Sequence, residues 1–215
     1  MKKLLLILLS AFIMGSCASV LGTAHPSTPS APTRTIHETI RNSIVRITQE
    51  SSTEQYVCTG FSIAPKNYLT AAHCTVQPQD MEGNPLTTEL RADGVKAFVV
   101  KQDVKLDLAI IVADFEKPSV NFRTEPLQWL EHVSAMGYGE GFMRPLVTSH
   151  RLVMWNYTLG PGIAPGNVYM DNFIGGMSGG PCYDDQGDIV GIVQRASDDI
   201  GYGVDVATLL AFISS

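Results

Sequence analysis

Short runs of apolar residues alternate with polar turns along most of this chain. Residues 44–48 alternate apolar and polar side chains, which is the pattern of a half-buried strand. We expect further strands at residues 57–63, 68–71, 96–101 and 108–112, and again at 133–136, 150–157, 167–170, 189–194 and 202–206. A polar passage at 116–128 separates the two groups, and residues 207–213, which lack glycine and proline, suit a terminal helix. The pattern predicts an all-β protein with two clusters of short strands.

The N-terminus carries a different pattern. Lys2 and Lys3 precede an apolar run, Leu4 to Met14, that is shorter than the roughly 20 residues of a membrane-spanning helix but typical of an export signal. The run ends in Met14-Gly15-Ser16-Cys17, which resembles a bacterial lipobox and predicts lipidation of Cys17. The alternative is an ordinary signal peptide with an incidental cysteine.

The segments after the signal divide into a tether and a folded body. Residues 18–35 are rich in proline, serine and threonine and predict a tether that holds the body off a membrane. Ordered structure is expected from about Ile36, with a short helical turn at 37–42, an N-terminal barrel at 36–118 and a C-terminal barrel at 119–215. We expect an exported protein anchored in the cell envelope, with the outer membrane favoured because Ala18 is not the aspartate of retained lipoproteins; otherwise it is periplasmic or secreted.

Composition narrows the partners. Hydrophobic residues make up 45% of the chain and charged residues 17%, which is enough apolar material for a core. The net charge of −6 argues against nucleic acid, because phosphate binding needs a basic face. We expect a monomer whose partners are a protein or peptide substrate and, through the lipid, a membrane.

The remaining cysteines suggest one cross-link. Cys58 and Cys74 lie 16 residues apart, and an exported protein meets an oxidising compartment, so a disulfide between them is expected. The alternative is two small buried thiols. Cys182 is left without a partner and is expected to be a buried apolar residue.

Three segments carry residues for nucleophilic catalysis. Ser178 lies among glycines, His73 follows Thr70-Ala71-Ala72, and Asp107 directly precedes an expected strand. Hydrolysis by serine needs a hydroxyl, a base that takes its proton and a carboxylate that orients the base. Asp103 competes for the acid role, but it lies in a loop-like stretch.

These segments resemble the three signature segments of trypsin/chymotrypsin-like serine peptidases. Further agreement comes from Gly137-Tyr138-Gly139 and from residues 190–193 and 203–204, so the similarity spans about residues 43 to 213. The resemblance implies two six-stranded antiparallel β-barrels, an active site in the cleft between them and a short C-terminal helix. It also implies that His73, Asp107 and Ser178 form the triad, with the N–H groups of Gly176 and Ser178 as the oxyanion hole.

Two features depart from the best-known members. Met177 stands where zymogen-activated members have an aspartate, so we expect no activation by insertion of a new N-terminus. By family spacing, the pocket for the side chain before the scissile bond has its floor at Asn172. The remaining pocket residues are then expected to be Phe173, Gln194, Arg195, Ala196, Tyr202 and Gly203. Phe173 and Tyr202 are expected to narrow the pocket, which favours a small or medium apolar side chain.

The sequence therefore predicts a serine endopeptidase that works through an acyl-enzyme intermediate, with neither a metal nor an organic cofactor. One alternative is a catalytically silent protease-fold module that binds partners at the cell surface. Another is a hydrolase of non-peptide esters on the same scaffold.

Overall fold

The protein is described by a computed structural model that covers residues 32–215 apart from 51–54, 78, 80–81, 85–86, 140–141, 159, 161–163 and 198. The expected export signal, Cys17 and most of the expected tether lie outside the described residues. Among the helices that the structure describes, none is long and apolar enough to cross a membrane.

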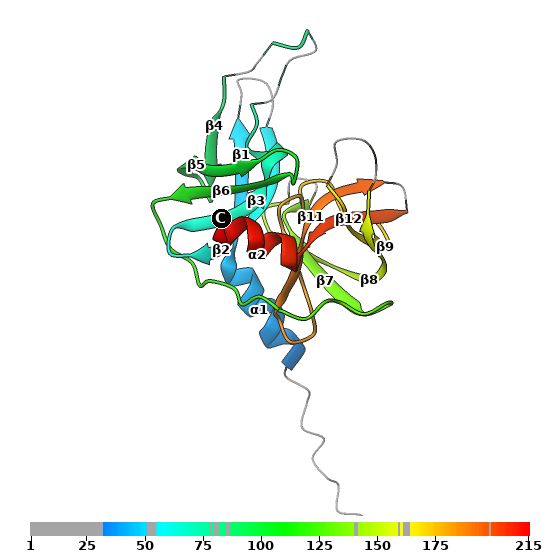
Figure 1. The fold of residues 1–215 in the computed structure, drawn as a ribbon. Coiled ribbons are helices and arrows are strands. Elements are labelled where there is room, and N and C mark those ends of the chain that lie inside the picture. Colours follow the sequence, from blue (N-terminus) through cyan, green and yellow to red (C-terminus); the bar gives the residue numbers. More distant parts are fainter. Residues whose placement is uncertain are drawn as a thin grey trace, which may run out of the picture. The chain divides into compact units, whose positions relative to one another are not determined.

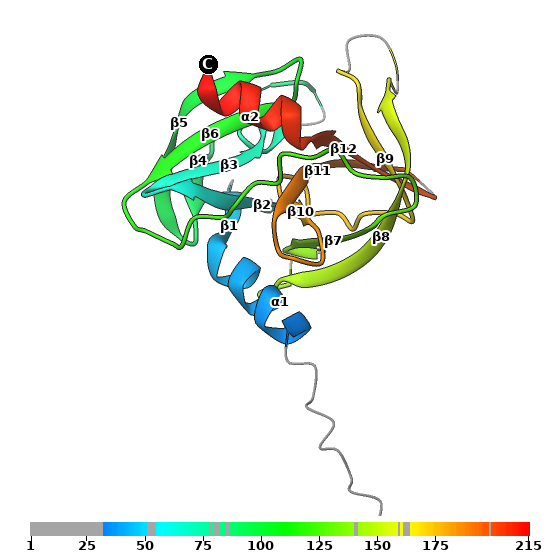
Figure 2. The ribbon, with the colours of Figure 1, turned by 60° about the horizontal axis from the view of Figure 1, so that its bottom comes forward.

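The described residues form two closed antiparallel barrels of six strands each, which lie side by side (Figures 1 and 2). The first barrel has the order β1-β2-β3-β6-β5-β4, and its strands are β1 (Ile44–Glu50), β2 (Gln55–Ala64), β3 (Asn67–Ala71), β4 (Glu89–Ala92), β5 (Val95–Asp103) and β6 (Leu108–Ala113). The second has the order β10-β11-β12-β9-β8-β7, from β7 (His132–Gly137), β8 (Leu146–Tyr157), β9 (Gly166–Met170), β10 (Pro181–Tyr183), β11 (Ile189–Ser197) and β12 (Ile200–Asp205). The helices are α1 (Pro32–Ser43), the short 3₁₀ helix η1 (Ala72–Cys74) and α2 (Val206–Ser214). The expected fold is confirmed.

Three elements differ from the expectation. The strands β4 and β10 were not anticipated, because each is too short to show an alternating pattern. The helix α1 is longer than the expected turn at 37–42 and begins at Pro32, a residue that is well suited to the first helical turn. Its Ile36 and Ile40 lie four residues apart and pack on the core from one face.

The barrels share a packed interior. One cluster of buried side chains joins Phe61 and Leu69 of the first barrel to Met136 and Ile192 of the second. Each barrel also has its own apolar filling, around Ile47 in the first and around Tyr169 in the second. Since close-packed interiors resist displacement, this shared core fixes the edges at which the two barrels meet.

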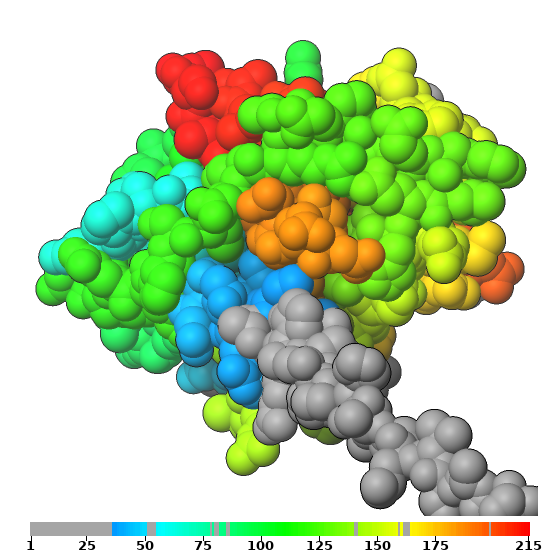
Figure 3. Space-filling model, turned by 90° about the horizontal axis from the view of Figure 1, so that it is seen from below, coloured from blue at the N-terminus to red at the C-terminus, as the bar shows by residue number. Residues whose placement is uncertain are grey.

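Both α-helices, α1 and α2, contact the two barrels. Ile36 of α1 lies next to Gly187 of the second barrel, and Figure 3 shows α1 in blue against the orange surface of this region. The helix α2 begins with a cap in which Asp205 accepts a hydrogen bond of 2.8 Å from the N–H of Thr208. Near its end, Lys101 of β5 donates to the carbonyl of Phe212, so α2 is tied to the first barrel (Figure 2).

Candidate active site

Asp107 holds His73 by two separate hydrogen bonds. The Oδ1 atom of Asp107 accepts from the main-chain N–H of His73, and its Oδ2 atom lies 2.8 Å from Nδ1 of the imidazole. The main-chain carbonyl of Asp107 also accepts from the N–H of Ala72, at 3.0 Å. A carboxylate can only accept hydrogen bonds, so the neutral ring carries its proton on Nδ1 and leaves Nε2 free as a base.

The backbone of Asp107 is shaped for this contact. Asp107 has a φ of 54°, in the left-handed region that aspartate tolerates better than most residues, directly before β6. Its side chain is only 12% exposed, whereas that of His73 is 43% exposed. The pair therefore joins a sheltered carboxylate to an imidazole that substrate can reach. Asp103 instead accepts hydrogen bonds from the N–H groups of Lys105 and Leu106, within its own turn.

Ser178 lies in a tight turn between the barrels. Its hydroxyl donates to the main-chain carbonyl of Gln194 at 3.2 Å, and no hydrogen bond joins it to His73 in this structure. Ser178 and His73 nevertheless line one cavity of about 480 Å³. The structure thus brings Asp107, His73 and Ser178 to one site, with the serine hydroxyl turned toward β11.

The turn before Ser178 has the geometry that exposes main-chain N–H groups. The N–H of Met177 donates to the carbonyl of Ile174 at 3.0 Å, and Gly176 has a φ of 93°. This is the geometry of a type II turn, which favours glycine at its third position. Neither the N–H of Gly176 nor that of Ser178 donates to an acceptor among the described residues. Both groups are therefore available for an anion.

Thr59 of β2 fixes this turn from the other barrel. Its N–H donates to the carbonyl of Ser178 at 2.8 Å, and its hydroxyl donates to the carbonyl of Gly176 at 2.9 Å. The same hydroxyl accepts from the N–H of Tyr138, and the carbonyl of Thr59 accepts from the hydroxyl of Thr70. Sequence reasoning missed Thr59, because nothing in a lone threonine of a strand indicates contacts across the barrels.

Met177 helps to order the turn by burial. It is fully buried in the interior of the second barrel. A side chain at Gly137 would come within 2.9 Å of the Met177 backbone, so glycine is needed there for the close approach. Met177 cannot form the ion pair that an aspartate makes at this position in zymogen-activated members. The packing of Met177 and the Thr59 hydroxyl hold the turn instead.

Residues 58–192 match the family model of the trypsin-like peptidase domain. The matched segment spans more than half of the chain and contains His73, Asp107 and Ser178. The chain belongs to the trypsin-like peptidase family. It is therefore a serine-type peptidase, a hydrolase, as the sequence predicted. No curated relative matches the sequence.

Solved structures of proteases share the fold of this peptidase. The active form of the Rv3671c protease from M. tuberculosis aligns with a TM-score of 0.71 at 24% identity, over 86% of each chain. An inactive form of the same protease has a TM-score of 0.67 at 24% identity, over 86% of this chain and 94% of the other. The HtrA-type protease AlgW, solved with a tripeptide, has a TM-score of 0.67 at 16% identity, over 85% of this chain and 62% of its own.

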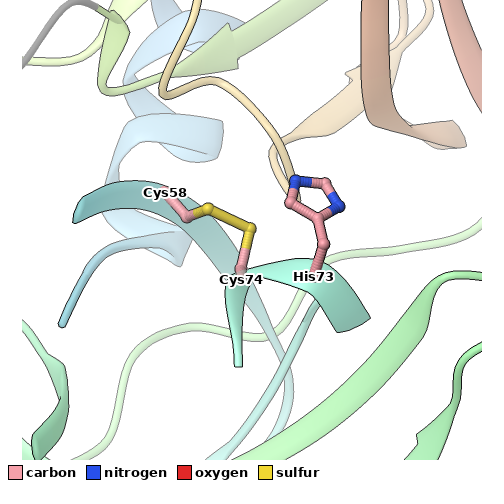
Figure 4. A group of neighbouring side chains, drawn as sticks. All are labelled: Cys58, His73 and Cys74. Carbon is pink, nitrogen blue, oxygen red and sulfur yellow. A yellow bond between two sulfur atoms is a disulfide. The ribbon is translucent and has the colours of Figure 1, made fainter. Parts of the chain in front are cut away.

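The disulfide expected from the sequence is present in the peptidase. It joins Cys58 of β2 to Cys74 of η1, and Figure 4 shows it beside His73. The two sulfur atoms and the imidazole lie close enough to resemble a metal site, but the sulfurs are bonded to each other and offer no thiolate. Cys182 is a buried thiol, and burial raises its pKa far above the usual range.

The residues expected to form the pocket before the scissile bond take different positions. Asn172, Arg195 and Ala196 are exposed, whereas Phe173 and Tyr202 are buried. The ring of Phe173 packs on His150 and Tyr169, and a side chain at Gly201 would meet it at 2.6 Å. The hydroxyl of Tyr202 lies within hydrogen-bonding reach of the carbonyls of Tyr157 and Ala164 and donates to them. Gly203 is buried, and a side chain there would meet the Ile192 carbonyl at 2.3 Å.

Gln194 has a position that the sequence did not suggest. Its side chain is buried, and Nε2 donates to the carbonyl of Leu106 at 2.6 Å and to that of Asp107 at 3.1 Å. Its own main-chain carbonyl accepts from Ser178. Gln194 therefore contacts the residues at both ends of the site, and its side chain supports the acid loop.

Proposed function

We propose that this chain is a serine endopeptidase that cleaves peptide bonds through an acyl-enzyme intermediate, with Ser178 as nucleophile, His73 as base and Asp107 as the orienting acid. The observation that carries the proposal is the double hydrogen bond from Asp107 to the main chain and the ring of His73. It fixes the imidazole in the tautomer whose Nε2 can accept the proton of a serine hydroxyl.

The chemistry follows from this geometry. When substrate binds, the Ser178 hydroxyl turns from the Gln194 carbonyl toward Nε2 of His73. Its proton passes to Nε2 as Oγ attacks the peptide carbonyl carbon, and the carbonyl oxygen becomes an oxyanion. The N–H groups of Gly176 and Ser178 donate to that oxygen, and each such donor is typically worth about 3 to 4 kcal/mol in the transition state.

The second half returns the enzyme to its first state. The imidazolium of His73 gives its proton to the leaving nitrogen, the peptide bond breaks, and an ester of Ser178 remains. Water then enters, His73 takes one of its protons, and the hydroxide attacks the ester. The attack gives a second tetrahedral intermediate. Its collapse releases the carboxylic acid of the substrate's acyl half, and His73 returns its proton to Ser178 Oγ.

Turnover of internally quenched peptides by matched variants tests the proposal. We expect Ser178→Ala and His73→Ala to lower kcat by at least 10³-fold, and Asp107→Asn by a comparable factor, because the amide favours the wrong tautomer. Ser149→Ala is the control, because Ser149 also bonds to a histidine, His132, that contacts an aspartate, Asp185. Cleavage that survives Ser178→Ala but is lost in Ser149→Ala would refute the assignment.

The silent binding module is less favoured, because an oriented base and two free N–H donors serve hydrolysis directly. The ester hydrolase is less favoured, because the matching family model describes a peptidase domain. A protein that binds peptides but turns over neither peptide nor ester would support the binding module. Turnover of esters alone would support the ester hydrolase.

We also propose, from the sequence alone, that the protein is exported, monomeric and carries a lipid on Cys17. The apolar run from Leu4 to Met14 and the lipobox-like segment Met14-Gly15-Ser16-Cys17 support the proposed anchor. The intact mass of the mature protein tests it: a chain that starts at Cys17 with added acyl mass supports the proposal, and an unmodified chain or a later start refutes it.

A further inference from the structure

The cavity of about 480 Å³ beside Ser178 lies in the first barrel. Besides Ser178 and His73, its described lining comes from β1, β2, η1 and the residues just after η1. Ile47 is almost fully buried at its base, whereas Tyr56 and Val76 are exposed at its rim. Its volume falls within the usual range of ligand pockets.

The chemistry of this cavity is apolar. Its described lining contains no carboxylate, lysine or arginine, and His73 is its only histidine. The amide of Gln49 is already committed, because Nε2 donates to the carbonyls of Cys74 and Val76, each at 2.9 Å, and Oε1 accepts from Thr88 at 2.8 Å. Burial of an apolar side chain in this cavity is therefore favourable, whereas a charged side chain would lose its hydration and gain few polar contacts.

The position of the cavity relative to the reacting atoms defines which part of a substrate it meets. His73 lines the cavity, whereas Gln194, whose carbonyl bonds to the Ser178 hydroxyl, does not. The leaving nitrogen must lie beside His73, because it takes its proton from Nε2. The substrate residues that follow the scissile bond therefore lie on the same side of Ser178 as the cavity.

The other side of Ser178, where the substrate residue before the scissile bond would lie, discriminates less between side chains. The ring of Phe173, a residue that the sequence assigns to the pocket for the side chain before the scissile bond, is buried and occupies the space in front of Gly201. Asn172, Arg195 and Ala196 are exposed. A small side chain before the scissile bond fits this arrangement, and small side chains discriminate weakly between substrates.

We propose that the peptidase selects its substrates after the scissile bond, by binding a large apolar side chain of the first or second leaving residue in this cavity. The inference rests on the proposed function, since it assumes acylation of Ser178. The substrate class is then proteins in which a small residue is followed closely by leucine, phenylalanine or methionine.

The test compares internally quenched peptides that share one acyl half and differ only after the scissile bond. Replacing leucine or phenylalanine by alanine in the leaving half is expected to lower kcat/KM by about 10- to 100-fold, because each fully buried methylene contributes about fourfold and the open rim leaves part of the side chain exposed. Aspartate is expected to be poorer still. Equal rates for apolar, small and charged leaving residues would overturn the proposal.

A rim variant adds a second measurement. Val76→Asp places a carboxylate at a half-exposed position of the rim, so the preference for leucine over lysine in the leaving half should fall by about tenfold. Val100→Asp is the matched control, because Val100 is similarly exposed on β5 and does not line the cavity. An unchanged preference in Val76→Asp, or an equal change in Val100→Asp, would contradict the proposal.

An ester with the same acyl half and a nitrophenolate leaving group separates the two claims. This substrate has no leaving residue, so it reports acylation and deacylation alone. If wild type hydrolyses neither ester nor peptide, the proposed function fails. If it hydrolyses the ester and the peptides but ignores the leaving residue, only the present inference fails.

Discussion

The side-chain amide of Gln194 donates to the main-chain carbonyl of Asp107 across the junction of the two barrels, at 3.1 Å. Asp107 belongs to the loop before β6 of the first barrel, and Gln194 to β11 of the second. The contact ties the acid loop, with its left-handed Asp107 backbone, to the strand whose carbonyl holds the Ser178 hydroxyl.

Gln194→Ala is expected to lower kcat about tenfold or more with little change in KM, because a small displacement of an orienting group is costly in rate. The same variant should lose about 1 to 3 kcal/mol of unfolding free energy, since two carbonyls lose a donor. Steady-state kinetics and urea unfolding measure both effects. Gln128→Ala, at an exposed position, serves as control, and equal kinetics in the two variants would contradict the account.

Thr59→Val tests how the serine turn is held. Valine keeps the shape of threonine but removes the hydroxyl that donates to Gly176 and accepts from Tyr138. We expect a loss of about 1 to 3 kcal/mol in unfolding free energy and a fall in kcat, because the turn that presents the N–H groups loosens. Thr59→Ser, which retains the hydroxyl, should recover most of the activity. A serine variant no better than valine would show that the methyl group, and not the hydrogen bond, matters.

Loss of the Cys58–Cys74 disulfide should destabilise the fold. The bond closes a loop with a sequence separation of 16, for which chain entropy gives a contribution of about 3 kcal/mol. We expect reductant, or the double substitution Cys58→Ala and Cys74→Ala, to lower Tm by several degrees. Reductant should have no effect on the double variant. A wild-type Tm that is indifferent to reductant would contradict this prediction.

His150 makes stability depend on pH. It is buried against Phe173, and desolvation lowers its pKa below the usual value, although the nearby Asp171 carboxylate opposes this shift and His132 adds to it. Because the folded-state pKa lies below the unfolded value, the unfolded chain binds the proton more readily. The stabilisation is therefore full above the unfolded pKa of about 6.5 and is lost as pH falls through the lowered folded-state value.

Urea unfolding of wild type and His150→Gln at pH 7.5 and pH 5 measures this effect. The wild type is expected to lose more unfolding free energy than the variant on acidification. The same loss in both proteins would mean that other groups carry the acid sensitivity.

The residues of the candidate site are easier to recognise in the sequence than the residues that support them. His73, Asp107 and Ser178 each lie in a local pattern, a histidine after a small-residue strand end or a serine among glycines, and such patterns are visible along the chain. Thr59 and Gln194 act through main-chain groups far away in sequence, and these contacts exist only once two barrels pack together. Local periodicity carries no information about them.

The same limit applies to the pockets. Family spacing assigned Phe173 and Tyr202 to the substrate pocket, but it gave no sign that both side chains are buried. The cavity beside Ser178 was not foreseen, because Ile47, Tyr56 and Val76 come from different elements and show no joint pattern. A strand such as β4, with four residues, was likewise too short for its period to stand out.

The most direct measurement of the central claim is the site of covalent capture by a fluorophosphonate, mapped by mass spectrometry of the digested protein. We expect a single adduct on the peptide that contains Ser178, formed by wild type and lost in His73→Ala. An adduct on Ser149 alone, or an adduct on Ser178 that forms equally fast without the His73 imidazole, would contradict it.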